Sequence, residues 1–234
     1  MASAVQTLRT KFGSVTVTPA GTGQSMMHTM ANWMWLPMIM MGVMAVATAV
    51  GLGIAQAQVG SDLGEEFTAL RQANFETLKP LTAGSLFLGI AFLLSGISFL
   101  LGTILGALRW GGGEMQESVG GPVKTLKMPM SAMMFLGLMM MGLMFALLAF
   151  GTLIFVATQA HDAWIGASAA GVPGNADALG RAQTYGSWAN PLRLAAIGVL
   201  LSGIALALYT ISNVLGFQFS RIRELITGQE EGGA

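Results

Sequence analysis

Methionine gives this chain its clearest chemical pattern, because 18 methionines occur in a sequence that has no cysteine. Two groups recur at helical spacing, so each group would lie along one helix face. The first row is Met30, Met34, Met38 and Met41, and the second is Met133, Met140 and Met144. Thioether sulfur is a soft ligand that suits Cu(I). If the rows bind copper, the ligands would be Met34, Met38, Met41, Met140 and Met144.

Methionine also serves packing, because its unbranched side chain fills irregular gaps and adapts to a partner. A methionine-rich face can therefore bind another subunit or the apolar tail of a cofactor. Copper lacks supporting cysteine or histidine ligands within the rows. We therefore favour packing or a partner surface, predict no cofactor, and keep Cu(I) as the alternative.

No other residues form a catalytic pattern. The two histidines, His28 and His161, are expected on opposite sides of a membrane, so they cannot share one metal or haem. The glycines at 111–113 follow an apolar segment instead of a strand, so they do not make a dinucleotide-binding loop. We expect no catalytic residues, no enzyme activity, no histidine or carboxylate metal site, and no nucleic-acid partner.

The elements that position these residues are four long apolar segments. The chain is 53% hydrophobic and 9% charged, whereas soluble domains carry about 25% charged residues. The charges avoid residues 34–56, 82–108, 130–158 and 194–217. Each segment exceeds the ~20 residues that a helix needs to cross a membrane, and is too long for barrel strands. The sequence predicts an all-α integral membrane protein with four transmembrane helices, to which lipid is expected to bind.

The segments between the spans differ in composition. We expect a cytoplasmic N-terminal segment (1–32), a first transmembrane hairpin (33–110) with an outer amphipathic helix (62–79), a cytoplasmic linker (111–128), a second transmembrane hairpin (129–217) with an irregular outer loop (160–190), and a cytoplasmic tail (218–234). The N-terminal segment alternates polar and apolar residues at 14–18 but has no helix signal, so we expect a neighbour to order it. Prolines 37, 80, 129 and 191 fall near the starts of the four spans, which predicts first-turn positions.

Lysine and arginine predict the orientation. With the N-terminus inside, seven basic residues face the cytoplasm: Arg9, Lys11, Arg109, Lys124, Lys127, Arg221 and Arg223. Four face outward: Arg71, Lys79, Arg181 and Arg193. The positive-inside rule then places both termini in the cytoplasm of a bacterial-type inner (plasma) membrane, with the chain crossing it several times.

The two hairpins resemble each other. Eight residues of the first span recur 100 positions later in the third: Met40, Met41, Gly42, Met44, Ala49, Gly51, Ile54 and Ala57. Residues 90–108 match residues 197–215 in the same way at an offset of 107. These matches predict an internal duplication of two tandem hairpins with the same orientation, related by a pseudo-twofold axis along the membrane normal.

Small residues are expected to mediate helix packing, because they let backbones approach closely in a membrane. The candidates in the first hairpin are Ala45, Ala49, Gly53, Ser98, Gly102 and Gly106. Gly102 and Gly106 correspond to Tyr209 and Asn213 in the fourth span, and we expect Tyr209 to pack over the groove at Gly102.

Charge-free spans, methionine-rich faces and a long N-terminal segment favour one function. We expect a non-catalytic structural or accessory subunit of a larger inner-membrane complex, packing against other subunits or copies of itself. The alternative is a small transporter or channel, for Cu(I) if the methionine rows bind it.

Overall fold

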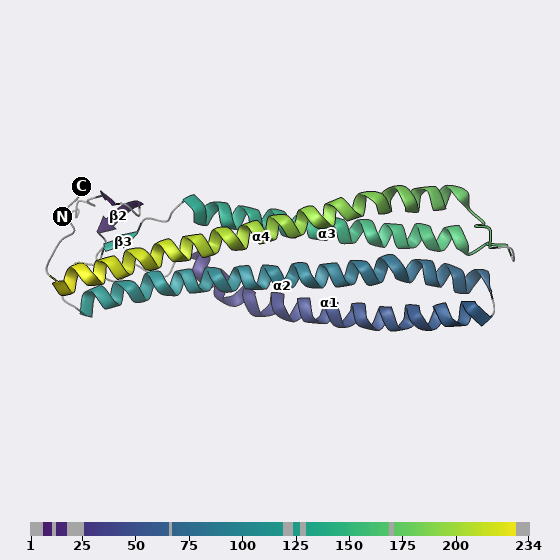
Figure 1. Cartoon of the computed structure of the whole chain (residues 1–234), viewed down its shortest axis with the longest axis horizontal. Helices are drawn as coiled ribbons and strands as arrows, with labels where there is room; N and C mark the ends of the chain where they lie inside the picture. Colours follow the sequence, from purple (N-terminus) through teal and green to yellow (C-terminus); the bar gives the residue numbers. More distant parts are fainter. Residues whose placement is uncertain are drawn as a thin grey trace. The chain divides into compact units, whose positions relative to one another are not determined.

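Four long helices dominate the structure. A computed structural model of the chain describes residues 7–10, 13–17, 26–65, 67–118, 124–126, 130–168 and 171–227. The helices are α1 (Met26–Glu65), α2 (Ala69–Ser118), α3 (Met130–Trp164) and α4 (Ala176–Thr227), labelled in Figure 1. All four are long and apolar enough to cross a membrane, which confirms the predicted number and type of spans.

The helices are longer than the predicted spans. Helices α2 and α4 contain 50 and 52 residues. Each corresponds to about 75 Å of helix at ~1.5 Å per residue, well beyond a ~30 Å hydrocarbon core. Residues 62–79 are therefore the end of α1 and the start of α2, and do not form a separate amphipathic helix. Much of the segment 160–190, expected to be irregular, likewise belongs to α3 and α4.

Side-chain caps explain where two helices begin. The Thr68 hydroxyl accepts a hydrogen bond from the backbone N–H of Arg71 at 3.3 Å, at the start of α2. The Asn175 carbonyl oxygen accepts one from the N–H of Ala178 at 3.0 Å, at the start of α4. Such caps satisfy N–H groups that lack a partner within the helix.

These early starts change the role of the prolines. Pro37, Pro80 and Pro191 lie inside α1, α2 and α4, so the prediction of first-turn positions was wrong for all three. Interior proline is tolerated in membrane helices because neighbouring groups satisfy the backbone carbonyl that it leaves free. Pro129 lies outside the described residues.

A small sheet accompanies the helices and was not predicted. Strands β1 (Thr7–Thr10), β2 (Gly13–Val17) and β3 (Lys124–Leu126) form an antiparallel sheet in the order β1-β2-β3. Thr10 pairs with Gly13, and Val17 pairs with Lys124. The alternation at 14–18 thus reflects a strand through Val17, and the strand that orders it comes from the chain's own linker.

The chain divides into two compact units, described separately below. We call Met1–Trp35, Ile97–Leu138 and Ser202–Ala234 the sheet unit, and Leu36–Gly96 with Met139–Leu201 the bundle unit. The core of the bundle unit draws on α2, α3 and α4, and consists of Phe87, Ala91, Ala146, Ala149, Ala196 and Leu200. A core of the sheet unit draws on the same three helices, and consists of Leu105, Ala132, Val214 and Phe217.

Candidate functional site

The methionine rows lie mostly at the surface. Met34 and Met38 on α1 are half-buried, and Met41 is exposed. Met140 and Met144 on α3 are also exposed, as is Met133. The Met30 side chain lies outside the described side chains. The Cu(I) alternative includes Met140 and Met144, both of which are exposed, and it stays a prediction.

The exposed methionines of α1 and α3 nevertheless match each other closely. Met40 is 56% exposed and its counterpart Met140 is 52% exposed. Met44 is 65% exposed and its counterpart Met144 is 68% exposed. The same methionine-bearing face, which we call the methionine face, is thus presented twice within the bundle unit.

The buried sides of these helices also match. A Cβ atom placed on Gly42 of α1 would lie 2.7 Å from the Leu93 Cγ atom of α2. A Cβ atom on Gly142 of α3 would lie 2.7 Å from the Leu200 Cγ atom of α4. Gly142 and Leu200 are the repeat counterparts of Gly42 and Leu93, so each hairpin closes around the same glycine–leucine contact.

A second pair of positions differs in size but conserves the contact. A Cβ atom on Gly89 would lie 2.6 Å from the Val46 side chain and 3.0 Å from the Gly42 carbonyl oxygen. The counterparts of Gly89 and Val46 are Ala196 and Ala146, both fully buried in the bundle core. One hairpin uses glycine against valine where the other uses two alanines, so similar combined volumes fill both contacts.

The predicted packing residues have mixed positions. Buried or half-buried are Ala45, Ala49, Gly53, Ser98, Gly102, Gly106 and Asn213. Tyr209 is exposed, and a Cβ atom on Gly102 would meet the Ala31 side chain of α1 at 3.5 Å. The prediction that Tyr209 packs over Gly102 was therefore wrong, because the start of α1 lies there.

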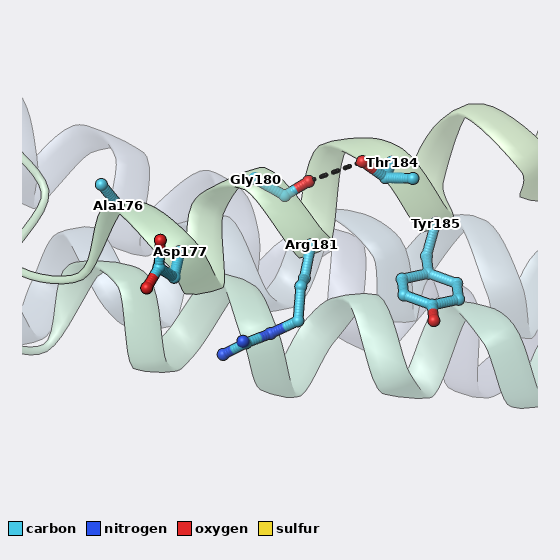
Figure 2. Close-up of a pocket in the computed structure, with 6 residues that line it drawn as sticks. All are labelled: Ala176, Asp177, Gly180, Arg181, Thr184 and Tyr185. Atoms are coloured by element: carbon cyan, nitrogen blue, oxygen red, sulfur yellow. Dashed lines mark hydrogen bonds between the residues drawn. The ribbon is translucent and has the colours of Figure 1, made fainter.

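A shallow hollow runs along the first turns of α4 in the bundle unit (Figure 2). It measures about 420 Å³ and is lined by Ala176, Asp177, Gly180, Arg181, Thr184 and Tyr185. The Arg181 Nε atom donates to the Gln159 side chain at 2.7 Å, and the Tyr185 ring meets Phe155 edge-on at 4.9 Å. Arg181 and Tyr185 thus attach α4 to α3, and their contacts explain them as structural residues.

A second hollow of about 380 Å³ is formed by α2, α3 and α4. Its two charged residues, Glu76 and Lys79, pair with each other at 2.7 Å. Glu76 also accepts from Gln72 at 3.1 Å, and Lys79 lies 4.4 Å from the centre of the Phe75 ring. Glu76 and Lys79 are thus held by each other and by neighbouring residues of α2.

Metal-binding side chains do not gather in the described part of the chain. Within it, no group of three or more His, Cys, Asp and Glu residues could hold a metal ion. The His161 Nδ1 atom lies 3.9 Å from the Asp162 carboxylate, and the two residues are neighbours on α3. The His28 side chain lies outside the described side chains.

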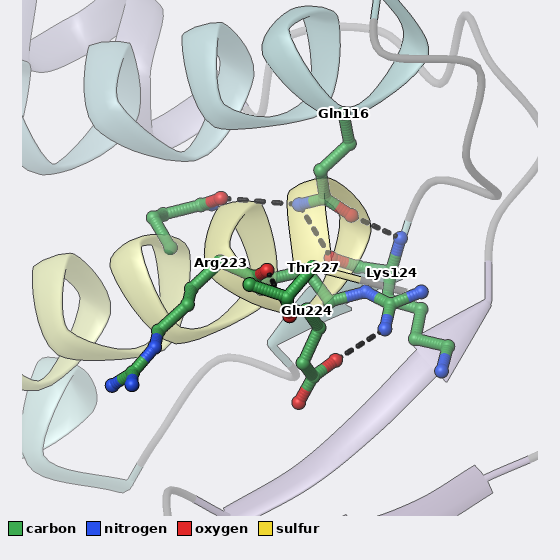
Figure 3. A network of polar contacts seen from close by, with 7 residues as sticks. Gln116, Lys124, Arg223, Glu224 and Thr227 are labelled. Carbon is green, nitrogen blue, oxygen red and sulfur yellow. Dashed lines mark hydrogen bonds and ion pairs between the residues drawn. The ribbon is translucent and has the colours of Figure 1, made fainter. Parts of the chain in front are cut away.

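A buried polar residue with three side-chain hydrogen bonds lies in the sheet unit, where α2 ends. Gln116 is fully buried, and its side-chain oxygen accepts from the Lys124 N–H at 2.8 Å. Its amide nitrogen donates to the Lys124 carbonyl at 3.2 Å and to the Gln218 side chain of α4 at 3.1 Å. Gln116 thus pairs with the edge of β3 as a neighbouring strand would (Figure 3). We call Gln116, Lys124 and Gln218 the glutamine clamp.

Two further features support the clamp. Gly112 stands one turn before Gln116, and a Cβ atom there would overlap the end of the Gln218 side chain where that side chain now lies. Arg221, one turn beyond Gln218, is buried and forms an ion pair with Glu224. A buried charge needs such a partner because desolvation is costly.

No protein family model, curated protein or solved structure matches this chain. The function therefore has to be argued from the chain's own geometry.

Sequence reasoning missed the glutamine clamp and the close glycine contacts. Gly42 and Gly142 carried a usable signal, because they recur in the repeat. Gln116 and Gln218 carried no such signal, because the sequence alone does not distinguish a buried glutamine from a solvent-exposed one. Only the fold shows that Gln116 lies beside a strand edge.

Proposed function

We propose that this protein is a non-catalytic structural or accessory subunit of a larger inner-membrane complex. The observation that carries the proposal is the methionine face, which α1 and α3 expose at matched positions such as Met44 and Met144. Methionine-rich surfaces suit adaptable contacts with a partner. The spans contribute little chemistry of their own, since their charge-free interiors offer no proton relay or ion path.

The proposal includes the internal duplication and the orientation predicted from the sequence. Matching glycine–leucine contacts at Gly42–Leu93 and Gly142–Leu200 support a duplicated hairpin. The excess of lysine and arginine in the N-terminal segment, linker and tail supports cytoplasmic termini in a bacterial-type inner membrane. In this orientation the glutamine clamp holds the small sheet on the cytoplasmic side.

Affinity purification from native membranes tests the accessory role. The tagged chain, solubilised in a gentle detergent, should co-purify with one or more other membrane proteins at a fixed ratio. A variant with Met40, Met44, Met140 and Met144 changed to Ala should lose most of this partner, because the contact area on the methionine face is reduced. Its own melting temperature should change little, since all four side chains are exposed.

A control variant separates this face from general loss of apolar surface. Leu86 and Ile90 are exposed on α2 of the same unit, outside the methionine face. Changing both to Ala should leave the partner bound. Equal retention of the partner by both variants would contradict a role for the methionine face, and absence of any partner from the unaltered protein would contradict the accessory role.

A further inference from the structure

The two hairpins pack against each other through α2 and α3 in the bundle unit. A Cβ atom on Gly84 of α2 would lie 3.3 Å from the Phe150 ring and 3.4 Å from the Leu153 Cβ atom of α3. Phe87 and Ala91 continue this side of α2 over the next two turns, and both are buried. We call this contact the inter-hairpin interface.

The corresponding side of α4 is exposed. The repeat counterparts of Gly84, Phe87, Ala91 and Leu94 are Pro191, Leu194, Gly198 and Leu201. All four counterparts are exposed, and Leu194 is exposed to 72% where Phe87 is exposed to 5%. On α4, therefore, the side that corresponds to the interface side of α2 is exposed in the part of the chain that the structure describes.

Most of the corresponding side of α1 is exposed as well; its exception is Gly53, the counterpart of Leu153, which is half-buried. On α3, Phe150 is half-buried and Ala157 is buried. Their counterparts on α1, Val50 and Ala57, are exposed. Val43, one heptad before Val50, is exposed in the same way, and its counterpart Leu143 is half-buried. In addition, 11% of the most apolar window of α1 is buried, against 33% of that of α3.

A closed pseudo-twofold bundle would bury both of these sides against each other. Under such symmetry, the Gly84–Phe150 contact would have a second copy between Pro191 and Val50. Both of those residues are exposed instead. The hairpins thus follow one another in an open arrangement. We call the exposed side of α4 around Pro191 and Leu194, and the exposed side of α1 around Val43 and Val50, the two half-interfaces.

We propose that copies of this chain assemble head to tail through these two half-interfaces, with α4 of one copy packing on α1 of the next. The occupant is a second copy because the inter-hairpin interface already shows how this type of contact is made. A head-to-tail contact is heterologous, so it yields a closed ring if the rotation closes and a longer row if it does not.

Side-chain sizes across the proposed contact are complementary. The inter-hairpin interface places small Gly84 against large Leu153 and Phe150. The proposed contact would place larger Pro191 against smaller Gly53 and Val50. The exchange of large and small residues keeps the helices close while avoiding overlap, as close packing in membranes requires.

Cysteine cross-linking tests the proposal cleanly, because the chain has no cysteine of its own. The built Cβ of Gly84 and the Cβ of Leu153 are 3.4 Å apart, close to the ~3.5–4.5 Å separation in disulfides. Their counterparts are Pro191 and Gly53. In membranes treated with copper–phenanthroline, the double variant P191C/G53C should form a ladder of dimers and larger species on a non-reducing gel. A mixture of the two single variants carrying different tags should stop at dimers that contain both tags.

Matched variants make each outcome decisive. G84C/L153C should cross-link within one copy, losing its free thiols while migrating as a monomer, which shows that the chain is folded and the oxidation works. The space around Gly53, whose nearest neighbour is Thr82 at 3.8 Å, admits a cysteine. Monomers alone from P191C/G53C, dimers from either single variant alone, or adducts with a different protein would each overturn the proposal.

This inference rests on the proposed duplication and is independent of the accessory role. A ladder without any co-purifying partner would support self-assembly while contradicting the accessory role. A co-purifying partner without a ladder would support the accessory role and contradict self-assembly.

Discussion

Single glycines determine how closely the helices of each hairpin approach. At Gly42 an added Cβ would lie 2.7 Å from the Leu93 Cγ atom and 2.9 Å from the Leu93 backbone nitrogen. The second distance matters most, because a backbone atom cannot move aside as the end of a flexible side chain can. At Gly142 an added Cβ would lie 2.7 Å from the Leu200 Cγ atom and 3.2 Å from the Leu200 backbone nitrogen, a contact that is close but less severe at the backbone.

Alanine substitution at these glycines should therefore destabilise the protein. We expect Gly42→Ala and Gly142→Ala each to cost about 1–3 kcal/mol through overpacking. The measurement is the melting temperature of the purified protein in detergent. Gly51 and Gly151 are matched controls on the same two helices, because nothing lies within 4 Å of a Cβ placed there. If all four variants melted alike, the close contacts would not contribute to stability.

The sequence predicted that small residues mediate helix packing. This stays a prediction, and two of the residues concerned, Ala49 and Ser98, are buried. The closest approaches, at Gly42 and Gly89, were not predicted, because glycine is frequent in membrane spans and only the rotation of each helix shows which ones face a neighbour.

At the scale of elements, the glutamine clamp attaches the sheet to the helices. Gln116 satisfies the N–H and the carbonyl of Lys124 and also reaches Gln218, so one side chain joins β3, α2 and α4. Because it is fully buried, water cannot replace these hydrogen bonds when the side chain is removed.

Replacement of Gln116 should loosen the sheet while leaving the bundle unit intact. Gln116→Leu would leave the half-buried backbone groups of Lys124 without these hydrogen bonds, at a cost of up to about 1–3 kcal/mol for each group that stays unsatisfied. Hydrogen–deuterium exchange should become at least several-fold faster for β2 and β3 but not for α3. The control is Gln58→Leu, because Gln58 is exposed on α1. Unchanged exchange in the Gln116→Leu variant would show that the clamp does not hold the sheet.

The elements themselves were predictable to different degrees. Charge-free length predicted four membrane-crossing helices, and the described part of the chain has four helices that are long and apolar enough to cross a membrane. Their ends were not predicted, because the caps at Thr68 and Asn175 are common residues whose role depends on the fold. The sheet was missed because pairing between β2 and β3 joins segments that are distant in sequence.

At the scale of the molecule, two similar hairpins expose apolar faces. The methionine face appears on both α1 and α3, and the half-interfaces appear on α1 and α4. In a membrane, lipid tails solvate such faces as well as another helix would, so exposure alone does not create a partner. The matched exposure of the methionine face on α1 and α3 supports the proposed binding to other subunits, and the exposed sides of α1 and α4 support the proposed binding to further copies.

The central claim, an accessory role without copper chemistry, is tested most directly by the composition of the native particle. The tagged chain should be purified from native membranes in a gentle detergent, its mass measured by native mass spectrometry, and its copper content determined on the same sample. We predict a particle that contains a different membrane protein at a fixed ratio and no copper bound by this chain. A particle made of this chain alone, carrying stoichiometric copper that is lost when Met38 and Met41 are changed to Leu, would contradict the account.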